Sequence, residues 1–134
     1  MGVAVINLGL KSLRCILFDD RGRKIQHAAR SIHSYLRANE VEQDAREWIT
    51  ALHEVMGDLQ RGGALSSVRA VTVTASASCL VSVDATGDPT HRVQMVSDAR
   101  CIEDARDLER CVRALGGEWC NTRVTADMLL PKAV

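Results

Sequence analysis

The first 22 residues constrain the fold of this chain most, because two apolar runs flank a short turn that contains glycine. Residues 3–8 form an almost unbroken apolar run that is rich in β-branched side chains. Gly9 and a polar turn follow, and residues 13–18 form a second apolar run that ends in a polar turn at residues 19–22. Continuous apolar runs of this length are typical of buried strands, and glycine suits the tight turns between them. The sequence therefore predicts two antiparallel strands at the start of the chain.

The next segments predict a third strand, a helix and a fourth strand. Residues 24–35 are more polar and indicate a third antiparallel strand near the sheet edge. Asp44 is a good N-cap for a helix, Glu47 completes a capping-box pattern, and the helix is expected to end at Gly62-Gly63. Residues 68–74 alternate and are β-branched, so they predict a strand that pairs parallel to an earlier one through a crossover.

The second half of the chain predicts smaller elements. Residues 80–83 indicate a short strand closed by a turn at residues 84–89. Residues 102–115 carry an apolar helical face and predict a helix that ends at Gly116-Gly117. Residues 125–130 predict the start of a helix that Pro131 interrupts. The element order is therefore β-β-β-α-β, followed by a small hairpin and a helix.

Size and charge exclude several classes of protein. The 134 residues, with 46% hydrophobic side chains, suit about one domain with a sizeable core. Lys plus Arg and Asp plus Glu both total 17, so the balanced charge indicates neither a nucleic-acid partner nor an anionic membrane. No apolar run approaches the length of a membrane span, and no signal peptide opens the chain. We expect a soluble cytoplasmic protein without membrane or nucleic-acid partners.

Cysteine and histidine positions indicate no metal centre and no catalytic nucleophile. The five cysteines lack Cys-x-x-Cys spacing, and their odd number favours reduced thiols in the cytoplasm. The four histidines are scattered without metal-ligand spacing. The sequence therefore predicts no catalytic residue and no metal ligand. The cysteines are Cys15, Cys79, Cys101, Cys111 and Cys120, and the histidines are His27, His33, His53 and His91.

Several short motifs follow one another along the chain. They are NLGLKSLR at 7–14, LFD at 17–19, EQD at 42–44, VDATGDP at 83–89, VSDAR at 96–100 and TADMLL at 125–130. In order and spacing they resemble motifs in the N-terminal part of the FGGY carbohydrate kinases, which phosphorylate sugars and polyols with ATP and Mg²⁺.

The resemblance implies a fold and a domain boundary. The expected fold is α/β, a ribonuclease-H-like domain of the actin/hexokinase-type ATPases, with an incomplete mixed sheet. Residues 1–134 would be the N-terminal portion of the first kinase domain, with the second domain absent. We expect apolar surface to be exposed where further segments normally pack, so the isolated chain would form a homo-oligomer.

The resemblance also implies a phosphate-binding turn after the first strand. The family pattern there is Asp-x-Gly-Thr-Thr-Ser-x-Arg, in which glycine admits phosphate oxygens to backbone N–H groups and the carboxylate helps to hold Mg²⁺. Asn7 replaces that carboxylate, and Leu10 and Lys11 replace the two threonines. We therefore expect Mg²⁺-nucleotide binding to be weakened or lost, and an ordinary hairpin turn is the alternative interpretation. The candidate phosphate-binding residues are Asn7, Gly9, Lys11, Ser12 and Arg14.

The candidate substrate-binding residues are Ser76, Ser78, Asp98 and Arg100. Both serines follow the fourth strand, where family members use larger polar side chains to hold sugar hydroxyls. Asp98 and Arg100 occupy the positions of an Asp-x-Arg motif in xylulose-kinase-like members. The alternatives are serines that line a strand end, and an acid and a solvated base at a helix N-terminus.

The expected function is that of an N-terminal fragment of an ATP-dependent sugar kinase. The full-length parent would transfer a phosphoryl group from ATP to a hydroxyl of a sugar or polyol, more specifically a ketopentose-like one. The fragment alone is expected to be inactive, because one half of a cleft cannot position nucleotide, metal and acceptor together. The alternative is a degenerate, non-catalytic relative of the sugar kinases that acts as a binding or interaction module.

Overall fold

The computed structural model describes residues 2–116 and 123–133, and the chain divides into two compact units. The first unit contains residues 1–33 and 44–76, and the second contains residues 34–43 and 77–134. The predicted helix end at Gly117 and the thiol of Cys120 lie outside the described residues.

The first unit is built on a four-stranded sheet with the strand order β3-β2-β1-β6. The two apolar runs form β1 (Gly2–Leu8) and β2 (Ser12–Phe18), which pair antiparallel. The edge strand β3 (Lys24–Ser31) pairs antiparallel with β2, and β6 (Val68–Ala75) pairs parallel with β1. The predicted antiparallel pairing of the first three strands, the edge position of the third and the parallel crossover are confirmed. The third strand is shorter than predicted, because it ends at Ser31.

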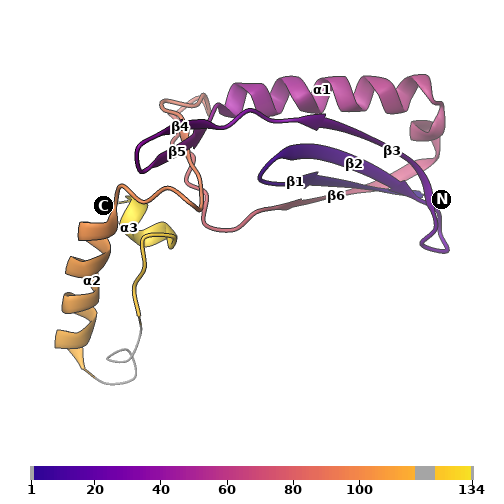
Figure 1. Cartoon of the computed structure of the whole chain (residues 1–134). Coiled ribbons are helices and arrows are strands. Elements are labelled where there is room, and N and C mark those ends of the chain that lie inside the picture. Colours follow the sequence, from indigo (N-terminus) through magenta and orange to yellow (C-terminus); the bar gives the residue numbers. More distant parts are fainter. Residues whose placement is uncertain (1, 117–122, 134) are drawn as a thin grey trace. The chain divides into compact units, whose positions relative to one another are not determined.

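One helix covers one face of this sheet (Figure 1). The helix α1 (Ala45–Arg61) begins after Asp44, whose Oδ1 accepts the N–H of Arg46 at 2.9 Å. It ends at Gly62 and Gly63, and Gly63 has a left-handed φ of 78° that favours glycine. A single turn of 3-10 helix (Ala64–Ser67) leads into β6. The predicted cap and stop are therefore both confirmed.

The core of the first unit lies between α1 and β1–β2. Because side chains alternate along a strand, every second residue of β2 points toward α1. Leu17 and Leu59 are each 0% exposed, and each contributes about 1.5–3 kcal/mol through the apolar surface it buries. The buried members of this core are Ala4, Leu13, Cys15, Leu17, Ile32, Ala51, Val55 and Leu59.

The second unit contains a small sheet and two helices. Its antiparallel strands are β4 (Tyr35–Arg37), β5 (Glu40–Gln43) and β7 (Val93–Gln94), and its helices are α2 (Ile102–Leu115) and α3 (Leu129–Ala133). The predicted helix at 102–115 is confirmed. The small sheet was not predicted from the sequence.

Two predictions for the second unit are wrong. Residues 80–83 form no continuous strand, because only Leu80 and Val83 make isolated bridges. Pro131 does not interrupt a helix, because α3 begins at Leu129 and places proline in the first turn. A proline there costs little, since the N–H groups of a first turn have no partner within the helix.

The described cysteines, Cys15, Cys79, Cys101 and Cys111, are free. Burial raises the pKa of the Cys15 thiol, which packs in the core as a small apolar side chain. Among the described helices, none is long and apolar enough to cross a membrane.

Candidate functional site

The turn between β1 and β2 is closely packed around Gly9. The N–H of Gly9 donates to the carbonyl of Ser12 at 3.0 Å, and the carbonyl of Lys11 accepts the N–H of Ile32 at 3.0 Å. A Cβ on Gly9 would lie 3.3 Å from Ser12 O and 3.5 Å from both Arg14 Nη2 and Asn7 Oδ1. Glycine is therefore favoured by the close approach of its neighbours. Its N–H closes the turn, so this N–H is not available to a ligand.

Three polar side chains line up across neighbouring strands beside this turn. Asn7 on β1 is paired with Arg14 on β2 and with Thr74 on β6. Paired residues share a face, and the alternation places all three opposite the side that packs on α1. We call these residues the Arg14–Asn7–Thr74 row. The structure thus brings Asn7 and Arg14 together beside the turn that contains Gly9 and Lys11, and it adds Thr74.

The predicted substrate serines belong to different units. Ser76 follows β6 in the first unit, where its N–H donates to the carbonyl of Leu8 at 3.1 Å. Ser78 belongs to the second unit and has a left-handed φ of 61°, which is uncommon for a residue other than glycine. The carbonyl of Ser78 accepts the Nζ of Lys132 at 2.8 Å.

The other predicted pair, Asp98 and Arg100, forms a network with Glu42. The Asp98 side chain is 0% exposed, and its oxygens accept the N–H of Val41 at 2.8 Å and the Nε and Nη2 of Arg100 at 2.9 and 2.7 Å. The Arg100 Nη2 also donates to Glu42 Oε1 at 2.7 Å. Asp98 is therefore enclosed by donors, so it can affect a ligand only by positioning Arg100.

Electrostatics stabilise both members of this pair in their charged forms. Burial raises the pKa of Asp98, but the hydrogen bonds from Arg100 and Val41 outweigh it, so the pKa lies below its usual value. Hydrogen bonding to Asp98 and Glu42 raises the pKa of Arg100.

Lys132 on α3 is a buried cation that the sequence did not indicate as important. It is 6% exposed, and its Nζ donates to the carbonyls of Ser78 and Met95 at 2.8 Å and of Val96 at 3.3 Å. These carbonyls belong to the segments that carry Ser78 and Asp98. Lys132 therefore connects α3 to both predicted substrate segments of the second unit.

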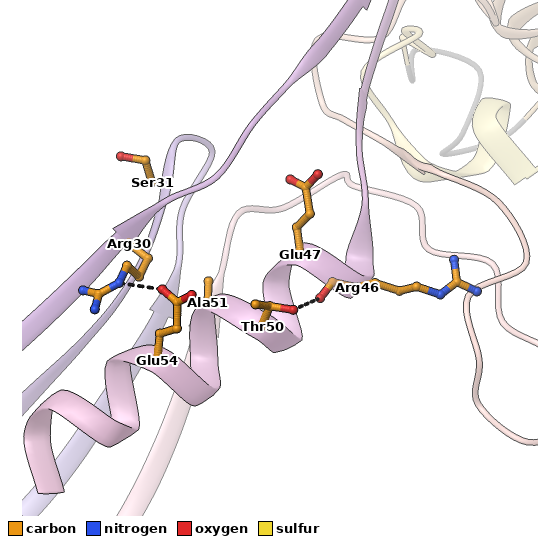
Figure 2. Close-up of a pocket in the computed structure, with 7 residues that line it drawn as sticks. All are labelled: Arg30, Ser31, Arg46, Glu47, Thr50, Ala51 and Glu54. Atoms are coloured by element: carbon orange, nitrogen blue, oxygen red, sulfur yellow. Dashed lines mark hydrogen bonds and ion pairs between the residues drawn. The ribbon is translucent and has the colours of Figure 1, made fainter.

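A shallow pocket of about 340 Å³ lies between β3 and α1, and none of the predicted site residues lines it (Figure 2). Arg30 extends into it from β3, and its Nε donates to Glu54 Oε2 at 2.7 Å. Its Nη2 donates to Asp58 Oδ2 at 2.6 Å. Both acids satisfy the Arg30 guanidinium, so the pocket offers it to no ligand. The remaining lining residues are Ser31, Arg46, Glu47, Thr50 and Ala51.

A sequence model of the FGGY family of carbohydrate kinases, N-terminal domain, matches residues 3–128. The chain belongs to this family. In a search of curated protein sequences, nothing matches the chain significantly.

Solved structures of kinases share the fold of this FGGY-family chain. A xyloylose (xylulose) kinase from Brucella ovis has a TM-score of 0.85 at 16% identity, covering 98% of the chain and 28% of the kinase. A xylulose kinase from Rhodospirillum rubrum has a TM-score of 0.77 at 22% identity, covering 84% and 24%. A Plasmodium falciparum glycerol kinase with ADP has a TM-score of 0.79 at 14% identity, covering 98% and 27%.

These comparisons confirm the predicted family and fold. The chain has the N-terminal fold of sugar kinases of the actin/hexokinase ATPase type. It spans about a quarter of the length of these solved structures.

The turn of this FGGY-family chain does not suit the divalent metal that the family implies. Magnesium prefers oxygen ligands, above all carboxylates and phosphates. Residues 2–18 and 68–75, which form β1, β2, their turn and β6, contain no Asp or Glu. They instead place the Arg14 guanidinium beside the Asn7 amide. Within the described residues, no group of three potential metal-binding side chains is found.

Thr74 is a candidate residue that sequence reasoning missed. The alternation of β6 was recognised, but the register that sets Thr74 beside Asn7 depends on a parallel pairing between segments 67 residues apart. The predicted parallel pairing of this strand with an earlier one, and the choice of Ser76 at its end, are the sequence signals that pointed to this region.

Proposed function

We propose that residues 1–134 are the N-terminal portion of the first domain of a carbohydrate kinase. The parent protein would transfer a phosphoryl group from ATP to a hydroxyl of a sugar or polyol. The observation that carries this proposal is the family match over residues 3–128. The sheet order β3-β2-β1-β6 is consistent with the fold expected for this family. The isolated chain is proposed to be inactive, because phosphoryl transfer requires nucleotide, metal and acceptor to be held together. The free cysteines support a cytoplasmic location.

The proposed residue roles follow the two groups of candidates. Asn7, Lys11, Ser12 and Arg14 would surround the nucleotide phosphates, with Gly9 giving them room. Ser76 and Ser78 would contact sugar hydroxyls, while Asp98 would orient Arg100 toward the substrate. The Asp98-Ala99-Arg100 motif favours a ketopentose-like substrate. ATP and Mg²⁺ are the expected cofactors of the parent, and metal binding at the turn is proposed to be weakened.

A second candidate function is supported by the same turn. Asn7 brings no negative charge to the water shell of a metal ion, and no acid replaces it on β1, β2 or β6. A degenerate relative that binds a sugar or a protein partner without phosphoryl transfer would tolerate this loss.

An assay of sugar-dependent ADP formation separates the two functions. We would compare the 134-residue chain with the longest chain that the gene encodes, using D-xylulose, D-ribulose and glycerol as acceptors. The kinase proposal expects turnover only in the longer chain, with a ketopentose preferred. Sugar binding without ADP formation in the longer chain would instead support the non-catalytic relative.

Substitutions in the predicted sugar segment then test the residue roles. The double change of Ser76→Ala and Ser78→Ala removes two hydroxyls and should weaken sugar binding about tenfold, if each hydrogen bond contributes about 0.5–1.5 kcal/mol. Ser66→Ala, in the exposed 3-10 turn, is the matched control. Equal affinities for wild type and the double variant would show that neither serine contacts the sugar.

A further inference from the structure

The Arg14–Asn7–Thr74 row presents hydrogen-bond donors that no group in the described residues engages. No hydrogen bond or ion pair of these three side chains is found in the described part of the chain, although Arg14 Nη2 and Asn7 Oδ1 both border the space over Gly9. The three residues lie in register on adjacent strands, about 5 Å apart from strand to strand. A guanidinium, an amide and a hydroxyl therefore converge from a rigid sheet on one small area.

The charge around this row favours an anion over a cation. The strands β1, β2 and β6 and the β1–β2 turn contain Lys11, Arg14 and Arg69 but no acidic residue. Lys11 lies in the turn itself and forms no ion pair with any described residue. A guanidinium donates to phosphate oxygens with charge-assisted hydrogen bonds, whereas it repels a divalent metal.

We propose that the Arg14–Asn7–Thr74 row, with Lys11, binds the terminal phosphates of a nucleotide directly and without a divalent metal. Leu10 and Lys11 stand where the family has two threonines, and Thr74 supplies a hydroxyl donor in their place. Lys11 and Arg14 neutralise the phosphate charge that the metal would otherwise neutralise. The assignment of a nucleotide rests on the proposed function, whereas the phosphate chemistry rests on the row alone. Inorganic pyrophosphate offers the same oxygens and is the matched probe.

Calorimetric titration of the 134-residue chain tests the metal independence. ATP, inorganic pyrophosphate and adenosine are titrated in EDTA, and again in excess Mg²⁺. We expect ATP and pyrophosphate to bind in EDTA and to bind more weakly in Mg²⁺, because the metal neutralises part of the ligand charge that the row recognises. ATP binding with no pyrophosphate binding would assign the affinity to the nucleoside and would overturn the proposal.

Variants locate the binding on the row. Arg14→Met should raise the Kd for pyrophosphate at least about tenfold, and Thr74→Val about threefold, as expected for a charged and a neutral hydrogen bond. Thr72→Val is the matched control, because Thr72 lies two residues earlier on the same face and pairs with Val5; it should leave the Kd unchanged. An equal effect of Thr72→Val and Thr74→Val would overturn the role of Thr74.

Asn7→Asp gives the sharpest result. The new carboxylate should repel pyrophosphate in EDTA and restore binding when Mg²⁺ is added, which reverses the metal dependence of the wild type. Wild-type binding that requires Mg²⁺ would overturn the inference and leave the kinase proposal intact. Metal-independent binding by the 134-residue chain, with no sugar-dependent ADP formation by the longer chain, would sustain the inference while contradicting the kinase proposal.

Discussion

A buried carboxylate is tolerated only when donors replace the water that it loses. Asp98 meets this condition through Arg100 and the N–H of Val41, and its side chain is fully buried. The Arg100 Nη2 also forms an ion pair with a second acid, Glu42, whose Oε1 lies 2.7 Å away. The three side chains therefore connect the β5 strand to the segment that precedes α2, and the charge of Asp98 is central to that connection.

We predict that Asp98→Asn lowers the free energy of unfolding by about 3 kcal/mol, because breaking a buried pair leaves polar groups without full partners. Urea unfolding measures this loss. Asp104→Asn, in the exposed first turn of α2, is the control and should cost less than about 0.5 kcal/mol. A loss for Asp98→Asn no larger than that of the control would contradict the buried network.

The pH dependence of the free energy of unfolding should also reveal the contribution of ionised Asp98. The pKa of Asp98 is lower in the folded chain than in the unfolded chain, where it is about 3.9. Its contribution is therefore present above pH of about 4 and is lost as pH falls through the folded pKa. Asp19, Asp58 and Asp84 share this direction, so the comparison that matters is between variant and wild type. Asp98→Asn should show a smaller loss of stability on acidification, and parallel curves would contradict the assignment.

At the level of single residues, the sequence identified which positions are unusual but not what they contact. Asp98 and Arg100 were selected because they match a family motif, and the structure adds that they bind each other. Their partners Val41 and Glu42 lie more than 50 residues away in the chain, so local patterns contain no signal for them. Burial then changed the interpretation of Asp98, since a saturated carboxylate cannot contact a ligand.

At the level of elements, α3 shows how a very short helix is held in place. Five residues are too few to form a stable helix through propensity alone, so tertiary contacts must hold it. Pro131 and Lys132 are its buried residues, and the Lys132 Nζ supplies three hydrogen bonds to main-chain carbonyls. The docking of α3 therefore depends on one ammonium group.

We predict that Lys132→Met releases α3, because Met keeps the apolar stem and leaves three carbonyls without a donor. The expected loss of stability is about 2–3 kcal/mol. Hydrogen exchange of peptides covering residues 124–133 should become at least tenfold faster, while exchange in β1 and β2 stays unchanged. Lys24→Met, at the exposed start of β3, is the matched control. Unchanged protection of α3 in Lys132→Met would show that burial of Pro131 holds the helix.

The long elements were predictable because their patterns repeat many times. The helix at 102–115 has fourteen residues with one apolar face, and its predicted bounds agree with α2. The strands β4, β5 and β7 have three, four and two residues, which is too few for a period to emerge. They form only because they pair with one another, so no local signal revealed the second sheet.

At the level of the whole molecule, the β6 edge of the first sheet leaves main-chain hydrogen-bonding groups and apolar side chains uncovered. The strand β6 lies at the end of the order β3-β2-β1-β6, and α1 packs on β2 and β3 instead. Val71 and Val73 are therefore 59% and 67% exposed, next to an unpaired strand edge. Residues 70–75 carry no charge and no proline, which are the usual features that prevent edge pairing.

We predict that the isolated chain self-associates through β6 at high concentration, because a second strand edge would satisfy the main chain and cover both valines. Sedimentation velocity over rising concentration measures this association. Val73→Lys places a charge on the edge strand and should shift the population to monomer. Val83→Lys, an exposed valine in the second unit, is the control and should leave association unchanged. A wild-type chain that stays monomeric up to millimolar concentration would contradict the prediction, and equal effects of the two lysines would place the contact elsewhere.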